Sequence, residues 1–288
     1  LLISKEKVEL SASVCKVDLV SELVGEFPEL QGIMGGYFAE EQGFEKEISI
    51  AISEQYLPIG LNSKVPKKPY SIALSLADKI DTLVGFFGIN QKPTSSKDPF
   101  ALRRLALGII KIIIENKKDF KIRDLISYSS SLYMDQGFKF ENKSLQKELS
   151  DFLMDRLKFY MKEEKIRHDI IQASTSYPSI DQSVIIFGKA KSLNKIINKQ
   201  NGIDIISSYK RASNILDSEL EKHNIELSNT TDPGIFKTDL EKILFKKIND
   251  LRKYFSSINK DENFEQSLIN LTEAKKVVFD FFDNVIVN

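Results

Sequence analysis

Residues 73–88, ALSLADKIDTLVGFFG, place apolar side chains at the spacing of one face of an α-helix. The members of this stripe are Ala73, Leu76, Ala77, Ile80, Leu83, Val84 and Phe87. Asp78 and Asp81 are three residues apart, so a helix brings their carboxylates to neighbouring positions of one face. The stretch therefore predicts a long helix that faces a core and carries an acidic pair.

The same helical spacing recurs along most of the chain. One stripe consists of Val14, Val17, Val20, Leu23 and Val24, and further stripes lie at residues 100–113, 152–161, 205–216, 240–255 and 264–285. The β-branched run at 112–114 also suits a buried strand, but its length favours a helix, which Asp98 would cap and Pro99 would begin. No sustained period-two alternation appears, so the sequence predicts an essentially all-α fold.

The expected connections lie at residues 57–69, 90–96, 174–181 and 228–234. Asn201-Gly202 is interpreted as a turn between two helices. Gly32 and Gly35 match no phosphate-binding loop, and we expect them to allow a turn or close helix packing. The serine-rich stretch at 174–179 is the best candidate for a domain boundary.

Composition limits the kinds of function. Lys and Arg together number 41, as do Asp and Glu, so the net charge of the 288 residues is zero. A protein that holds nucleic acid by bulk electrostatics is usually basic, so RNA binding would need local patches or a partner. Cys15 has no partner for an internal disulfide, which fits a reducing compartment, and we expect it to be a small buried residue.

Five motifs follow one another along the chain. They are EFPELQGIMG at 26–35, ADKIDTLVGFFG at 77–88, KDPFALRR at 97–104, KRASNIL at 210–216 and FFDNVIV at 281–287. Together and in this order they resemble the β subunit of the bacterial two-subunit glycyl-tRNA synthetase. The chain begins with Leu1, so we expect a fragment of a longer protein.

The resemblance implies a domain organisation. Residues 1–120 resemble an HD-type helical domain, residues 121–178 a helical connector, and residues 179–288 a helical anticodon-binding domain of the DALR type. Family members continue beyond the position of residue 287 with another helix, so we expect the last domain to be cut short and to leave apolar side chains near the C-terminus exposed.

The resemblance also implies a function. The α subunit of that family activates glycine with ATP and Mg²⁺, whereas the β subunit binds tRNA-Gly. This chain would then be a cytoplasmic, non-catalytic part of a ligase with two α and two β subunits. We expect no cofactor in the chain itself and no membrane association.

HD hydrolases bind a divalent metal through His and Asp ligands, and the resemblance places those positions at Val17-Asp18, Gln55 and Asp78. Val17 and Gln55 cannot supply the missing imidazole nitrogens, so we predict no metal site and no phosphohydrolase activity. Asp78 and Asp81 could hold Mg²⁺ weakly, but the favoured alternative is that they pair with Lys79 and other bases or form hydrogen bonds within the domain. His168-Asp169 is an HD dipeptide within a charged segment, and we interpret it and His223 as surface residues.

Three groups of residues suit a phosphate backbone. Arg103 and Arg104 lie near the start of the helix that Asp98 caps, where an anion would relieve the unfavourable position of the cations. The second group is a basic stripe of Lys191, Lys195 and Lys199, and the third, Lys210, Arg211 and Asn214, belongs to the KRASNIL motif and lies opposite Tyr209, Ala212 and Leu216. For each group a structural role, as an ion pair, a solvated face or a tie to a neighbouring helix, is the alternative.

Two other functions compete with a tRNA-binding subunit. An active HD phosphohydrolase is disfavoured by the missing imidazoles. A helical interaction scaffold without RNA binding is favoured by the zero net charge.

Overall fold

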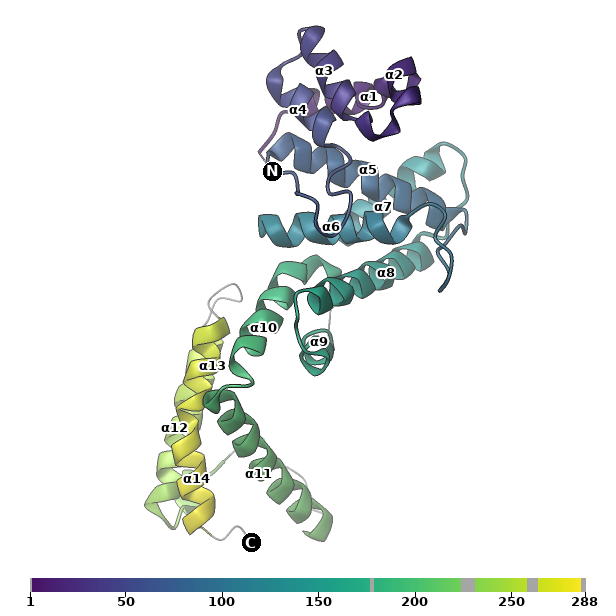
Figure 1. Ribbon diagram of the computed structural model, residues 1–288. Helices are drawn as coiled ribbons and strands as arrows, with labels where there is room; N and C mark the ends of the chain where they lie inside the picture. Colours follow the sequence, from purple (N-terminus) through teal and green to yellow (C-terminus); the bar gives the residue numbers. More distant parts are fainter. Residues whose placement is uncertain (1, 177–178, 224–230, 258–263, 286–288) are drawn as a thin grey trace. The chain divides into compact units, whose positions relative to one another are not determined.

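The computed structural model describes residues 2–176, 179–223, 231–257 and 264–285. All regular secondary structure in these ranges is helical, so the predicted all-α fold is confirmed (Figure 1). The chain divides into two compact units. The first comprises Leu1–Lys165 and Thr175–Phe187, and the second comprises Ile166–Ser174 and Gly188–Asn288.

The first unit contains eight of the α-helices in the described ranges and three short 3₁₀ segments. The α-helices are α1 (Lys5–Val14), α2 (Glu22–Glu26), α3 (Ile33–Glu41), α4 (Lys46–Glu54), α5 (Pro69–Gly88), α6 (Leu102–Asn116), α7 (Ile122–Asp135) and α8 (Asn142–Glu163). The 3₁₀ segments are η1 (Val17–Val20), η2 (Pro28–Leu30) and η3 (Ile180–Gln182).

Helix α5 is the central element of the first unit, because it packs against α1, α4, α6, α7 and α8. From the stripe predicted for this helix, Leu76, Ile80, Leu83, Val84 and Phe87 are buried. Ala73 and Ala77 instead line a cavity that is described below. In α6 the run at 112–114 is buried and helical, as predicted.

The first predicted stripe is wrong, because the chain leaves the helical path after α1. Lys16 has φ −112° and ψ 12°, and Ser21 has an extended backbone and caps α2 by accepting a hydrogen bond from Val24 N at 3.2 Å. Val17 and Val20 are 57% and 88% exposed, so they do not face a core. The turn carries Asp18 inward, where its carboxylate binds backbone N–H groups of another segment.

Helix α6 begins at Leu102 and not at Pro99. Ala101 adopts a left-handed conformation with φ 53°, which separates Pro99 and Phe100 from the helix. Asp98 still caps α6, since its carboxylate accepts hydrogen bonds from the backbone N–H groups of Leu102 at 2.8 Å and Arg103 at 3.0 Å. Phe100 lies outside the helix and stacks on Phe86, with ring centroids 4.1 Å apart.

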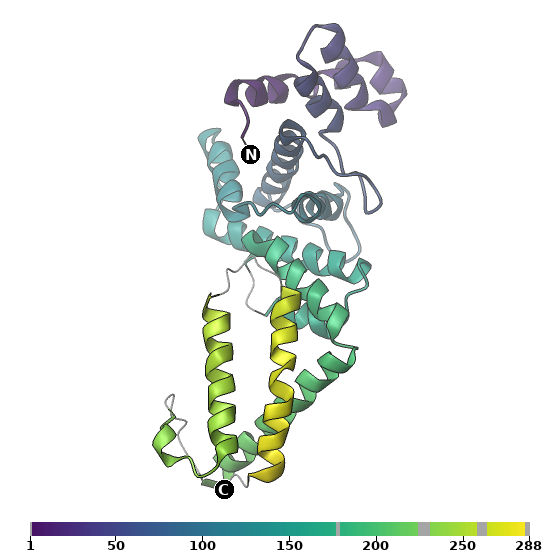
Figure 2. The same ribbon diagram turned by 90° about the vertical axis from the view of Figure 1, so that its left-hand side faces the viewer.

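The second unit contains α9 (His168–Ser174), most of α10 (Ser183–Ile196), α11 (Gln200–His223), α12 (Asp239–Ser257), α13 (Phe264–Thr272), α14 (Ala274–Asn284) and the 3₁₀ segment η4 (Pro233–Ile235). Helices α12 and α14 lie side by side, and α11 packs against α13 and α14 (Figure 2). None of the described residues of α12, α13 and α14 is fully buried.

Two expectations for the second unit are wrong. Asn201-Gly202 lies in the first turn of α11, and the turn between α10 and α11 falls at residues 197–199. A Cβ atom on Gly202 would lie 2.4 Å from the carbonyl oxygen of Ile196, so glycine permits this tight turn. The stripe at 264–285 forms two helices, because the helix is interrupted at Glu273.

The chain passes between the two units more than once, because residues 166–174 belong to the second unit and residues 175–187 to the first. Helices α7 and α8, which lie in the predicted connector, pack against α5 and α6 of the first unit. The assignment of an HD-type domain and an anticodon-binding domain to this chain stays a prediction.

Candidate functional site

Asp18 is a buried carboxylate that organises the start of α3. It is 1% exposed, and its Oδ2 accepts hydrogen bonds from Gly32 N at 2.6 Å and Gly35 N at 3.1 Å. Gly32 has φ +80°, and a Cβ atom on Gly35 would lie 3.2 Å from the carboxylate. These glycines therefore allow a turn and a close approach, as expected.

Gln55 occupies the position where the resemblance suggested an imidazole. Its side chain is fully buried, and Nε2 donates to the carbonyl oxygens of Cys15 at 2.5 Å and Ile52 at 3.0 Å. The amide therefore ties the end of α4 to the turn after α1. Cys15 is buried, as predicted, and its thiol donates to Ala12 O at 3.2 Å.

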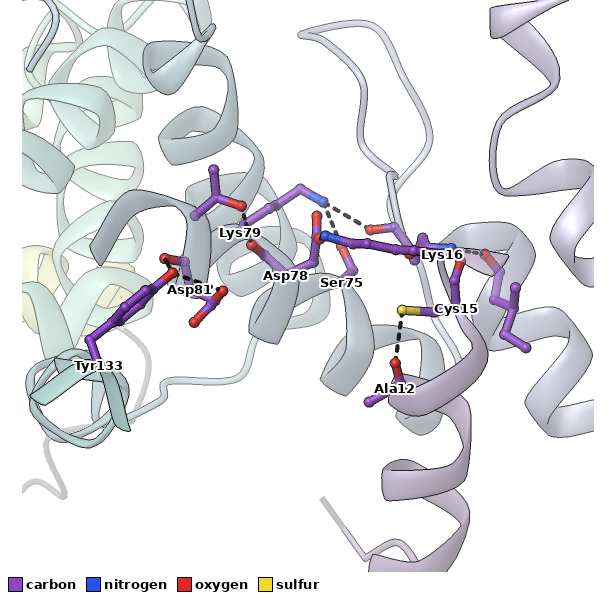
Figure 3. Close-up of polar contacts among 11 residues, drawn as sticks. Ala12, Cys15, Lys16, Ser75, Asp78, Lys79, Asp81 and Tyr133 are labelled. Atoms are coloured by element: carbon purple, nitrogen blue, oxygen red, sulfur yellow. Dashed lines mark hydrogen bonds and ion pairs between the residues drawn. The ribbon is translucent and has the colours of Figure 1, made fainter. Parts of the chain in front are cut away.

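The carboxylate of Asp78 pairs with Lys16 and not with the adjacent Lys79. Lys16 Nζ lies 2.6 Å from Asp78 Oδ1 (Figure 3). Partial burial lowers the pKa of Lys16, but the hydrogen bond and charge of Asp78 outweigh this effect and leave that pKa above its ordinary value. The ion pair joins the turn after α1 to the middle of α5.

Lys79 points into the core on the other side of α5. Its side chain is 1% exposed, and Nζ donates to Gln55 O at 3.2 Å, Leu57 O at 2.9 Å and Ser75 Oγ at 2.8 Å. These three acceptors match the three N–H groups of an ammonium. Burial lowers the pKa of Lys79 to about 8, while the charge of Asp78 acts in the opposite direction.

Asp81 connects α5 to α7. Its carboxylate accepts a hydrogen bond from Tyr133 OH at 3.2 Å (Figure 3). It accepts another from Ser129 Oγ at 3.4 Å. Burial and the charge of Asp81 raise the pKa of Tyr133 to about 12, so this tyrosine stays protonated and donates its hydrogen bond. Asp78 and Asp81 line the same cavity, which confirms that they share a face of α5.

The described residues contain no group of three or more His, Cys, Asp or Glu side chains placed to hold a metal ion. The positions suggested by the HD resemblance have structural partners instead, because backbone amides engage Asp18 and an ammonium engages Asp78. His168 begins α9 and is exposed, in line with the expected surface position. His223 ends α11, and its side chain lies outside the described features.

Arg103 and Arg104 differ in their surroundings. Arg103 donates to the carbonyl oxygen of Thr94 and lies 3.9 Å from a carboxylate oxygen of Asp98. Arg104 is exposed, and its side chain forms no hydrogen bond or ion pair with any residue that the structure describes. The start of α6 thus presents one anchored and one available guanidinium.

A third cation, Arg156 of α8, lies close to Arg103. Its guanidinium lies over the rings of Phe152 and Phe159, 5.8 and 5.7 Å from their centroids. Burial lowers the pKa of Arg156; the charge of Asp155 opposes this effect, the charge of Arg103 adds to it, and the charge of Asp98 opposes it. No pattern in the sequence indicated this residue, because α8 approaches α6 only through the tertiary fold.

The three lysines of the predicted basic stripe lie in two elements. Lys191 and Lys195 belong to α10, whereas Lys199 lies in the turn before α11. Lys195 forms an ion pair with Glu265 of α13 at 3.2 Å. The predicted stripe placed all three lysines on one helix, and this placement is wrong for Lys199.

The KRASNIL motif lies in α11, where its two cations differ. Arg211 forms an ion pair with Asp283 at 2.6 Å, donates to Phe282 O at 2.9 Å and lies over the rings of Phe279 and Phe282. Lys210 and Asn214 are exposed, and their side chains bond to no residue in the described ranges. Arg211 is thus a tie between α11 and α14, whereas Lys210 is available to a partner.

The sequence predicted that Lys210, Arg211 and Asn214 lie on one face of α11 and Tyr209, Ala212 and Leu216 on the opposite face. This prediction is only partly correct. Tyr209 is 71% exposed and Leu216 is 43% exposed, so neither is a core residue of the second unit. Ala212 is half-buried. The accessible face of α11 is therefore wider than the sequence predicted.

The fold and the site define an all-helical protein in which buried polar side chains tie helices together and several cations remain accessible. The chain belongs to the glycyl-tRNA synthetase β subunit family, whose model, described as glycyl-tRNA synthetase beta subunit, matches residues 1–176. Similar curated proteins carry the name glycine–tRNA ligase beta subunit. The relative from Rickettsia canadensis is 39% identical over 97% of this chain, and that from Cereibacter sphaeroides is 36% identical over 96%.

A third relative, from Dinoroseobacter shibae, is 35% identical over 96% of the chain. The chain spans only about two-fifths of the length of these proteins, with 40%, 40% and 42% of each covered. In the described part of the chain, no helix has both the length and the apolar character that a membrane span needs.

Proposed function

We propose that this chain is the tRNA-binding part of the β subunit of a heteromeric glycyl-tRNA synthetase. It would hold tRNA-Gly so that the α subunit attaches glycine, and it would not itself be catalytic. The complete enzyme would use ATP and Mg²⁺, contain two α and two β subunits and work in the cytoplasm. Family membership supports the assignment to a synthetase subunit.

The arginine cluster of the first unit, Arg103, Arg104 and Arg156, is the observation that supports RNA binding most directly. Two of these guanidinium groups, those of Arg103 and Arg156, are close enough to affect each other, with Asp98 beside Arg103 and Asp155 near Arg156, so three cations face two acids. Arginine favours phosphate oxygens because its planar fork donates two parallel hydrogen bonds. A local excess of positive charge is what a chain of zero net charge needs to bind RNA.

Lys210 is the corresponding candidate in the second unit. Its side chain is exposed, and so is the ring of Tyr209, the preceding residue of α11; an accessible cation can contact a phosphate and an accessible ring can stack on a base. Lys191, Lys199 and Asn214 remain candidates, while Lys195 and Arg211 would have to exchange their ion pairs for phosphate.

The test compares binding of tRNA-Gly to single variants at several salt concentrations. Arg104→Ala and Lys210→Ala should each weaken binding by on the order of 1 kcal/mol at low salt and flatten the salt dependence by about one unit. Their effects should add, because the residues belong to different units. Lys143→Ala removes an exposed cation of α8 outside the candidate set, so it should leave both quantities nearly unchanged.

Arg211→Ala provides a second comparison at the neighbouring position. Because Arg211 ties α11 to α14, its loss should lower the melting temperature more than the loss of Lys210 does. If Arg104→Ala and Lys210→Ala fold normally and keep the affinity and salt dependence of the parent chain, these residues are not the RNA contacts. A chain that binds no tRNA at low salt would favour the helical scaffold.

A further inference from the structure

The first unit contains a cavity of about 700 Å³ bounded by the end of α1, the middle of α5 and α7. Its wall is mainly apolar and includes Ala73, Ala77 and Ile80 of α5 and Leu125 and Leu132 of α7. Small-molecule sites typically measure roughly 300–1,000 Å³ and combine apolar walls with a few polar groups. The cavity has the volume and mixed lining of such a site, and it is open to solvent, since Ala77, Leu125 and Leu132 are exposed.

The charged groups of the lining do not balance. Among the residues that line it, only Lys16, Asp78 and Asp81 carry a formal charge. Lys16 is committed to Asp78 at 2.6 Å. Asp81 receives hydrogen bonds from the neutral hydroxyls of Tyr133 and Ser129, and no cation among the described residues pairs with it. The mainly apolar lining thus includes one carboxylate, Asp81, which is exposed to solvent and has no cationic partner among the described residues.

This charge determines what the cavity can accept. A phosphate or carboxylate would meet repulsion from Asp81, so an RNA backbone does not suit the cavity. A compact metal ion would leave the apolar wall unfilled, and the described acids offer no set of three ligands. An ammonium group attached to an apolar body satisfies both features, because the ammonium pairs with Asp81 while the body covers the wall.

We propose that this cavity binds a small organic amine, whose ammonium contacts Asp81 and whose aliphatic or aromatic body lies between α5 and α7. The arginine cluster and Lys210 do not line the cavity, so this site is separate from the residues proposed to bind tRNA. The competing occupant is an apolar segment of another protein, which would not require a cationic group.

The test uses three probes of similar shape with the 288-residue chain: phenethylamine, 2-phenylethanol and 3-phenylpropionate. Binding is followed through the methyl resonances of Ala77 and Leu132 in NMR spectra. The amine should bind about threefold more tightly than the alcohol, because an ion pair with an exposed carboxylate is worth on the order of 0.2–1 kcal/mol, and the acid should bind most weakly. Equal binding of the three probes, or no binding, would overturn the proposal.

Two variants and one control variant test the role assigned to the charges. Asp81→Asn should remove the preference for the amine over the alcohol, whereas Asp151→Asn, which removes an exposed acid of α8 outside the cavity, should preserve it. Lys16→Met should increase the preference, because it frees Asp78. Circular dichroism and the melting temperature check that each variant is folded, and an unchanged preference in folded Asp81→Asn would contradict the proposal.

Discussion

Two buried lysines show how single residues hold the loop between α4 and α5. Lys79 binds the carbonyl oxygens of Gln55 and Leu57, and Lys111 of α6 binds those of Leu61 at 2.5 Å and Ser63 at 2.7 Å. A buried carbonyl without a hydrogen bond is costly, so these ammonium groups replace the donors that regular secondary structure would provide. The loop is therefore fixed by side chains of two helices.

The pKa of Lys79 leads to a prediction about stability. Between about pH 8 and pH 10.5 the unfolded chain keeps this proton while the folded chain loses it, so the free energy of unfolding should rise with pH in this window. Lys79→Met should remove this contribution, which is on the order of 3 kcal/mol across the window. Urea unfolding of both proteins at several pH values measures the difference. Parallel curves would show that Lys79 titrates at its ordinary pKa.

At the scale of elements, the two glycines that end α5 explain much of the motif at 77–88. A Cβ atom on Gly85 would lie 2.6 Å from Tyr133 OH, and one on Gly88 would lie 2.2 Å from the ring of Phe140. Absence of a side chain at both positions therefore lets α7 and the segment after it approach α5. The motif encodes a packing surface as well as the acidic pair.

Gly88→Ala should accordingly destabilise the first unit. The added methyl group must displace the ring of Phe140, and overpacking of this kind costs about 1–3 kcal/mol, partly offset by the higher helix propensity of alanine. Gly25→Ala in α2 is the matched control, because nothing lies within 4 Å of its Cβ position. Chemical denaturation compares the two variants, and equal stability would contradict close packing at Gly88.

The sequence predicted helices well where an apolar stripe ran without interruption, as in α5, α8 and α12. It failed where a polar side chain with a distant partner redirects the backbone. Asp18 is the main example, because its hydrogen bonds to Gly32 and Gly35 draw it inward and expose Val17. Periodicity records only which residues are apolar, so it cannot reveal such a contact.

The candidate sites show the same limit. The spacing of Asp78 and Asp81 correctly placed them on one face, and the predicted pairing of Asp78 with a base is confirmed. That base is Lys16 and not the named Lys79, because Lys16 is 62 positions away in the chain and adjacent in space. Arg156 and Tyr133 reach their sites through contacts of α8 and α7 with the helices before them. Local spacing contains no information about these approaches.

At the scale of the whole molecule, the proposed division of labour leads to a prediction about catalysis. The chain on its own should give no glycine-dependent ATP–pyrophosphate exchange, because its sequence has no recognisable phosphate-binding loop and we assign activation to the α subunit. The control is the same assay with a full-length β subunit and a candidate α subunit, which should show exchange. A signal from the pure chain would place activation in this polypeptide.

The sparse packing of α12, α13 and α14 has a consequence for amide hydrogen exchange. Exchange requires local opening, and the free energy of opening is small where few side chains are buried. The amides of these helices, none of whose described residues is fully buried, should therefore exchange with deuterium much faster than those of α5 and α6. Mass spectrometry of labelled peptides measures both sets in one sample, and bound tRNA-Gly should slow exchange in the second unit if this unit contacts it.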